Sequence, residues 1–162
     1  MPARIHRFRH TDHMSTDREL PAPEHRRPPG TGDDTVAALG KLSESLETVE
    51  RARGLLYSFH QLIGHADLQL GDAVDALRSA GHDATADRLE TELVGLNVLD
   101  GRWTFQVVEE FDDGYWSTFR ELERAARDEL LDGRRHLFEA EMKEARRTHG
   151  RAGHEARPSK GE

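Results

Sequence analysis

The sequence has no cysteine and only three lysines, against 20 arginines. Without cysteine the chain forms no disulfide and has no thiolate chemistry, which fits a reducing cytoplasm. No run approaches the roughly 18 consecutive apolar residues of a membrane span. Residues 1–20 also lack the apolar core of a secretory signal peptide. We therefore expect a cytoplasmic protein that does not cross a membrane.

The chain as a whole has many charged residues and few apolar ones. Hydrophobic residues make up 35% of the chain and charged residues 33%, which is low and high respectively for a globular protein. The net charge of −8 is unevenly spread, because residues 33–133 hold 22 acidic and 9 basic side chains. An acidic central region repels nucleic acid, so we do not expect a nucleic-acid partner.

The ends of the chain are predicted to be disordered tails over residues 1–32 and 149–162. Prolines and glycines punctuate the first tail, and neither tail has enough apolar residues to form a core. The sequence Met14-Ser15-Thr16-Asp17 within the first tail suggests that translation starts at Met14. Residues 33–148 are predicted to form one helical bundle domain.

Apolar residues recur every three or four positions from residue 39, which predicts a long first helix over 34–63 that opens at Asp33 or Asp34. Gly64 is expected to separate it from a second helix over 66–80, which Gly81 ends in a left-handed turn. A third helix is predicted over 84–96 and a terminal amphipathic helix over 134–148. The apolar stripe of the first helix consists of Leu39, Leu42, Leu46, Val49, Ala52, Leu56, Phe59 and Ile63.

The segment 103–119 fits two structures. Trp103, Phe105 and Val107 alternate with polar residues, and residues 112–114 suit a hairpin turn. Read as a helix, Tyr115 and Phe119 belong to an apolar stripe that stays in phase through residue 131. Because an isolated hairpin is only marginally stable, the pattern favours a long, aromatic-rich fourth helix, with the hairpin as the alternative. The predicted fold class is an all-α helical bundle.

The same segment holds the candidate binding residues. Concentrated aromatic side chains can line a ligand pocket, and Trp103, Tyr115 and Glu110 are the candidates for lining it. Trp116 lies about 100° from Tyr115 on a helix, off the apolar stripe. We therefore expect Trp116 to be a surface anchor for a protein partner or a second subunit.

A metal site is the weaker alternative. Glu109, Glu110 and Asp113 lie within one helical turn, and paired carboxylates can hold a divalent ion. However, the Glu-x-x-His pairs of di-iron bundles and the calcium-loop spacing of EF-hands are both missing. Motifs for nucleophilic catalysis or nucleotide binding are missing as well. We therefore expect no cofactor and no catalytic residue.

Two segments of the sequence carry a resemblance to a known protein family. Residues 92–116 read Glu-Leu-Val-Gly-Leu-Asn-Val-Leu-Asp-Gly-Arg-Trp-Thr-Phe-Gln-Val-Val-Glu-Glu-Phe-Asp-Asp-Gly-Tyr-Trp, and residues 139–150 read Glu-Ala-Glu-Met-Lys-Glu-Ala-Arg-Arg-Thr-His-Gly. Over roughly residues 34–157 the chain resembles a family of uncharacterised actinobacterial helical proteins with no assigned function. The resemblance implies a bacterial cytoplasmic protein and gives no site residues.

Together these patterns predict a non-enzymatic helical interaction or scaffold module, which pairs with itself or with another protein through helix faces. The alternative is a helical bundle that binds a small molecule or a metal through residues 103–119.

Overall fold

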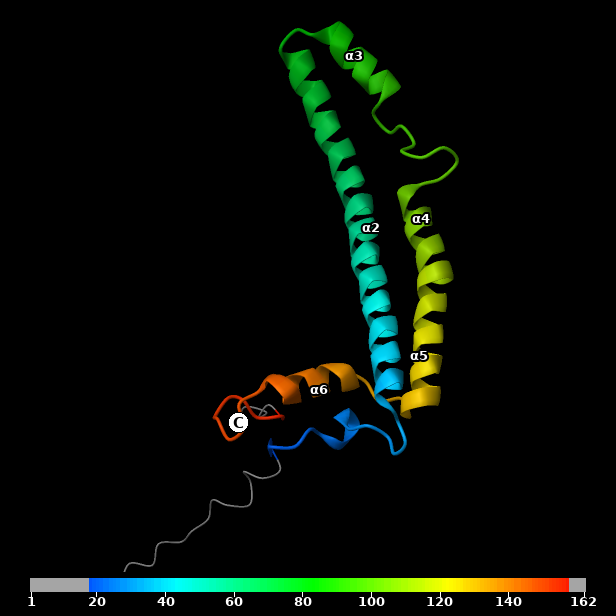
Figure 1. The fold of residues 1–162 in the computed structure, drawn as a ribbon. Helices are drawn as coiled ribbons and strands as arrows, with labels where there is room; N and C mark the ends of the chain where they lie inside the picture. Colours follow the sequence, from blue (N-terminus) through cyan, green and yellow to red (C-terminus); the bar gives the residue numbers. More distant parts are fainter. Residues whose placement is uncertain (1–17, 158–162) are drawn as a thin grey trace, which may run out of the picture. The chain divides into compact units, whose positions relative to one another are not determined.

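The computed structural model describes residues 18–157, and within this range the chain is all-α, with no β-strand. The predicted fold class is therefore confirmed, whereas the suggested start at Met14 lies outside the described residues. None of the helices in this range is both long enough and apolar enough to cross a membrane. The elements, drawn in Figure 1, are η1 (Pro23–His25), α2 (Asp33–Ser79), α3 (Asp83–Glu92), α4 (Thr104–Phe111), η2 (Asp112–Trp116), α5 (Ser117–Leu131) and α6 (Leu137–Arg146).

The chain divides into two compact units. Among the described residues, unit 1 consists of the chain up to Ser43 and from Glu123 onward, and unit 2 is Glu44–Leu122. The long helix α2 contributes its first turns to unit 1 and the rest to unit 2, and α5 contributes to both in the same way.

Helix α2 is longer than predicted. Its 47 residues run from Asp33 to Ser79 without a break, so the predicted separation of helices 34–63 and 66–80 at Gly64 is wrong. A glycine inside a helix costs only about 1 kcal/mol relative to alanine, and the flanking turns offset this. Helix α2 ends where predicted: Gly81 has a φ of 82°, and the backbone N–H of His82 donates to the Leu77 carbonyl at 2.9 Å.

Residues 104–131 are helical throughout, since α4, η2 and α5 follow one another without a gap. The alternative of a hairpin over 103–119 is therefore wrong. The start of α4 is fixed by Gln106, whose side-chain oxygen accepts a hydrogen bond from the Trp103 backbone N–H at 2.9 Å. The element η2 is a π-helical turn, a feature that is often found at functional positions.

Two helices are shorter than predicted because left-handed residues border them. Helix α3 ends at Glu92 rather than 96, because Gly95 has a φ of 71° and the Val94 N–H bonds back to the Leu89 carbonyl at 3.1 Å. Helix α6 begins at Leu137 rather than 134, because His136 before it has a φ of 59°, and it ends at Arg146 rather than 148, because the backbone of Arg147 is extended.

Unit 1 has a small apolar core built from α2, α5 and α6. Its buried side chains are Val36, Leu39, Leu131 and Leu137, with Leu42 and Ala126 packed against them. Residues 18–32, which we expected to belong to a disordered tail, include η1 and contact α6. Arg27 pairs with both Glu141 and Asp33, the latter at 2.5 Å.

A second arginine ties the N-terminal segment to the end of α6. The Arg147 guanidinium is buried, and it donates to the Glu19 carboxylate and the Glu19 carbonyl at 2.6 Å each. It also pairs with Glu144 at 2.6 Å. Within the expected C-terminal tail, Arg157 Nε donates to the Leu20 carbonyl at 2.9 Å. Residues 18–32 and 149–157 thus fold against each other and against α6.

Unit 2 is a pair of antiparallel rods. Helix α2 runs alongside a second rod formed by α4, η2 and the first turns of α5, and α3 lies in the connection between the rods (Figure 1). Buried apolar side chains are few in this unit: Val74, Ala86 and Val108. One stripe of α2 faces the second rod, and we call this stripe the seam. Its buried or half-buried residues are Leu46, Val49, Arg53, Leu56, His60, Ile63, Leu70, Val74 and Leu77.

Candidate interaction surface

Three polar residues of α2, spaced seven apart, tie the returning chain of unit 2 to α2: Arg53 and His60 hold the second rod, and Asp67 holds the connection between the rods. They occupy one position of the seven-residue repeat, and each bonds to a different part of the chain that returns alongside α2. Polar residues at such seam positions specify register in coiled coils, since sliding one rod by a turn would separate every pair. The contacts are Arg53 with Asp112 at 2.7 Å, His60 Nδ1 with Thr104 Oγ1 at 2.8 Å, and the Gly95 N–H with Asp67 Oδ1 at 2.9 Å.

Among these groups, Asp112 of the π-turn accepts the most hydrogen bonds. Arg53 donates to both carboxylate oxygens, at 2.7 and 2.8 Å, and the Tyr57 hydroxyl donates to Oδ2 at 2.7 Å. The hydrogen bonds from Arg53, reinforced by Tyr57 and opposed by partial burial, lower the pKa of Asp112 below its usual value. The hydrogen bond to Asp112, together with burial, raises the pKa of Tyr57. Asp112 is therefore an anion engaged in structural bonds.

Trp116, the predicted surface anchor, is half-buried in the same cluster. The guanidinium carbons of Arg53 and Arg120 lie 4.1 and 4.6 Å from the centre of its rings, a cation–π arrangement. Its indole nitrogen is buried and has no hydrogen-bond partner among the described residues. Trp116 thus packs mainly inside unit 2, and the suggestion that it anchors a partner stays a prediction.

The three predicted pocket residues each contact different neighbours. Trp103 and Tyr115 are exposed by 61% and 60%. Trp103 packs edge-on against Phe105, with ring centres 5.2 Å apart, whereas Tyr115 packs against Phe111 and Phe119. The third pocket residue, Glu110, forms an ion pair with Arg102. These separate neighbours give no sign of a common pocket for the three side chains.

The metal alternative has no support in the part of the chain that the structure describes. Glu109, Glu110 and Asp113 are exposed, and no three acidic, histidine or cysteine residues between 18 and 157 gather in a metal-binding arrangement. One reason is that Glu110 is engaged by Arg102.

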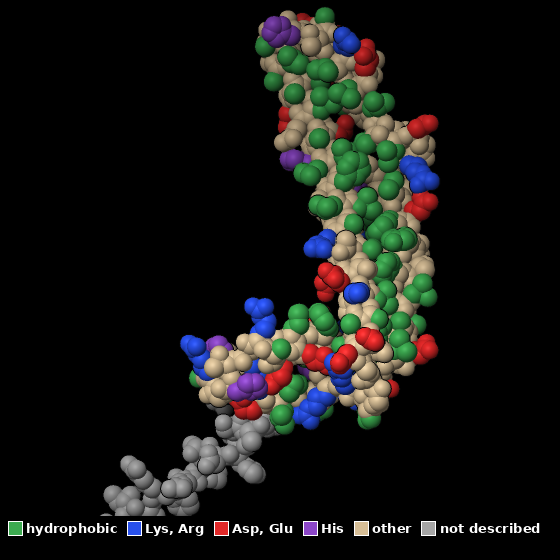
Figure 2. All heavy atoms as spheres, in the orientation of Figure 1, with side chains coloured by type: hydrophobic (Ala, Val, Ile, Leu, Met, Phe, Trp, Pro, Cys, Tyr) green, Lys and Arg blue, Asp and Glu red, His purple; other side chains and the backbone are tan. Residues whose placement is uncertain are grey.

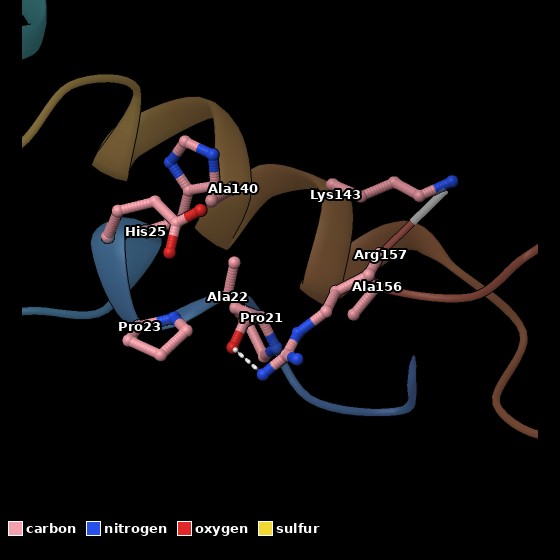
Figure 3. A pocket seen from close by; sticks show the side chains of 9 residues that line it. Pro21, Ala22, Pro23, His25, Ala140, Lys143, Ala156 and Arg157 are labelled. Atoms are coloured by element: carbon pink, nitrogen blue, oxygen red, sulfur yellow. Dashed lines mark hydrogen bonds between the residues drawn. The ribbon is translucent and has the colours of Figure 1, made fainter. Parts of the chain in front are cut away.

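A hollow of about 410 Å³ lies in unit 1, away from every predicted site residue. It is bounded by residues 21–25, by Ala140 and Lys143 of α6, and by Ala156 and Arg157 (Figure 3). Arg157 Nη2 donates to the Pro21 carbonyl at 3.3 Å across one side. The hollow is therefore a gap between the segment before α2 and the end of the chain.

The most distinctive surface is an apolar face of unit 2. On α2, a second stripe lies about a quarter turn from the seam and advances in steps of three and four. Hydrophobic side chains gather in a band over α2 and the second rod on the side of unit 2 seen in Figure 2. We define the apolar face by Ala52, Leu55, Phe59, Leu62 and Ala66 on α2 and by Phe111, Tyr115, Phe119 and Leu122 on the second rod.

Exposure is high on this face. Leu55 is exposed by 72%, Leu62 by 65%, Leu122 by 65%, Tyr115 by 60% and Phe59 by 40%. Single exposed apolar residues are common on protein surfaces, but a contiguous set of large ones marks an interaction site.

The sequence reading missed this face because it assigned Ala52 and Phe59 to the stripe that packs inside the bundle. In the structure their neighbours Arg53 and His60 are half-buried there instead, while Ala52 and Phe59 are exposed. The available signal was the strict alternation of three and four, which continues from Leu46 to Leu77 only when the three polar residues Arg53, His60 and Asp67 are counted.

No family model, curated protein or solved structure matches the chain. The resemblance to an actinobacterial family, and the cytoplasmic location that it implies, therefore stay predictions.

Proposed function

We propose that the chain is a non-enzymatic helical interaction module, and that the apolar face of unit 2 packs against helices of another polypeptide. The observation that carries the proposal is the contrast within unit 2 between three buried apolar side chains and a row of large exposed ones. Fully burying one leucine or phenylalanine side chain contributes about 1.5–3 kcal/mol, so covering this row is strongly favourable.

Helix α2 in unit 2 has two apolar stripes but only one neighbouring rod. The second rod covers the stripe that includes Leu56, Ile63 and Leu70, and it leaves Leu55, Phe59 and Leu62 exposed. Helices with two such stripes are typical of bundles in which each helix has two neighbours. Another helix, or pair of helices, is therefore the partner that the geometry of α2 fits.

The polar contacts of the seam support the same proposal. Because Arg53 and His60 fix the register of the two rods and Asp67 holds the connection against α2, the apolar face is organised before a partner arrives. A preorganised surface loses less conformational entropy on binding. This is the behaviour expected of a scaffold element rather than of a segment that folds on binding.

The size of the native complex tests the proposal. In an extract of cells that produce the full chain at its natural level, we expect it to migrate in a complex larger than its 18.3 kDa monomer. Phe59→Glu should reduce that complex to the monomer, because a carboxylate would have to be buried in the contact. Leu68→Glu is the matched control, since Leu68 is exposed by 71% on the same helix but lies about 180° from Phe59.

Migration of the wild-type chain as a monomer would overturn the proposal. Equal effects of Phe59→Glu and Leu68→Glu would also overturn it, because they would show that the apolar face is not the contact.

A further inference from the structure

We infer that the polypeptide covering the apolar face is a second copy of this chain, related to the first by a two-fold axis that crosses α2 at Phe59. The inference rests on the proposed function and adds the identity and direction of the partner. Two-fold contacts bring the same patch of both copies together, so they require a patch that is complementary to itself.

The exposed stripe of α2 meets that requirement because it reads alike in both directions. Phe59 is its centre, a leucine stands on each side of it, and an alanine stands beyond each leucine. In an antiparallel pair centred on Phe59, Leu55 of one copy meets Leu62 of the other. Ala52 likewise meets Ala66, and these small side chains let the helices approach closely. In a parallel pair each large residue would instead meet the same residue of the other copy, and Leu55 would not meet Leu62.

Charge favours the same crossing point. Unit 2 carries 16 acidic and 6 basic residues, so two copies repel each other over most of their length. Residues 51–66 contain no aspartate or glutamate, and this acid-free stretch is the part of α2 that bears the stripe. Contact between the two α2 stripes centred on Phe59 therefore brings no carboxylate of residues 51–66 against another.

The available area is of the size that a dimer needs. The exposed fractions of Leu55, Phe59, Leu62, Tyr115 and Leu122 correspond to about three whole side chains, or roughly 600 Å² at about 200 Å² each. Specific interfaces bury about 800 Å² on each partner. The alanines of α2 and the half-buried rings of Phe111 and Phe119 border this surface and supply the remainder.

The mass of the purified full chain is the first test. Light scattering during size-exclusion chromatography should give twice 18.3 kDa for the wild type and for Leu68→Glu, and 18.3 kDa for Phe59→Glu. Circular dichroism of each variant verifies that the helices remain. A monomeric wild type at micromolar concentration would overturn the inference.

Single-cysteine variants test the axis, and the absence of native cysteine makes them unambiguous. Ala52→Cys and Ala66→Cys chains, mixed and oxidised with copper phenanthroline, should give a mixed disulfide. Each variant alone should cross-link little, because residues seven positions from the axis lie roughly 21 Å from their own copies, beyond disulfide reach. Cross-linking of Ala52→Cys with itself would indicate a parallel pair and would overturn the two-fold arrangement.

Together, the two measurements distinguish a failure of the dimer proposal from a failure of the proposed interaction module. If the purified chain is a monomer while the complex in the extract is still lost with Phe59→Glu, the second copy is refuted and the interaction module stands. If the extract also shows only a monomer, both are refuted.

Discussion

Units 1 and 2 use similar helices in opposite ways. Unit 1 buries some of its large apolar side chains, such as Leu39 and Leu131, in one core, and ties its irregular segments to α6 through the ion pairs of Arg27 and Arg147. Unit 2 buries little and presents Leu55 and Leu62 to solvent, while its polar residues fix the register of two rods. The difference supports the proposal that unit 1 stabilises the chain while the apolar face of unit 2 is available to a partner.

The largest expected effect lies in the core of unit 1. Leu131 is exposed by 4% and its neighbour Leu130 by 48%. Leu131→Ala should lower the free energy of unfolding by about 2–5 kcal/mol, because the truncation leaves a cavity. Leu130→Ala removes the same atoms from a largely solvated site and should cost well under half as much. Urea denaturation followed by circular dichroism measures both, and equal losses would show that unit 1 has no defined core.

The next-largest expected effect is the loss of stability of unit 2 at acidic pH. The hydrogen bonds from Arg53 lower the pKa of Asp112, so the carboxylate stabilises the fold fully above its unfolded value of about 3.9. That stabilisation is lost as the pH falls through the lowered pKa of the folded state. Carbon-detected NMR should find the Asp112 titration midpoint below 3.8, and Arg53→Met should raise it.

Asp112→Asn tests the same coupling through stability. The variant should be less stable than the wild type at pH 7, and the difference should shrink as the pH falls below about 4. Asp113→Asn is the control, since Asp113 is exposed on the same turn and should leave the acid limb of the stability curve unchanged. A constant difference between Asp112→Asn and wild type across this range would contradict the assigned role of Asp112.

Sequence patterns predicted the helical class, the start of α2 and the left-handed turn at Gly81, because periodicity and local turn chemistry are recorded in neighbouring residues. They did not predict that α2 continues through Gly64, since a small local penalty is offset by many residues around it. Nor did they identify which stripe packs inside unit 2. Arg53 can occupy the seam only because Asp112 lies opposite, 59 positions away.

The candidate binding residues show the same limit. The prediction that Trp116 protrudes follows from its angle relative to Tyr115, but that angle does not reveal that Arg53 and Arg120 stack on its rings. Similarly, prolines and glycines in residues 18–32 favour disorder, and nothing local shows that Arg27 pairs with Glu141 of α6 or that Glu19 pairs with Arg147.

A smaller effect would loosen unit 1 locally. Arg147→Met removes the hydrogen bonds to Glu19 and Glu144, bonds that hold the pKa values of both carboxyl groups below their usual range. Hydrogen exchange of residues 18–22 should speed up by roughly tenfold or more, because local opening governs it. Arg146→Met changes an exposed neighbour on the same helix. If both variants exchange alike, Arg147 does not hold the N-terminal segment in place.

The smallest effect compares two helical glycines, one in each unit. A Cβ added at Gly64 of unit 2 meets nothing within 4 Å, whereas one at Gly40 of unit 1 lies 3.2 Å from Cγ of Phe138. Gly64→Ala should therefore stabilise the protein by about 0.5–1 kcal/mol, the usual gain from removing glycine inside a helix. Gly40→Ala should gain less, because the Phe138 ring must shift. Thermal unfolding resolves the two, and a larger gain at Gly40 would mean that unit 1 is not the more tightly packed unit.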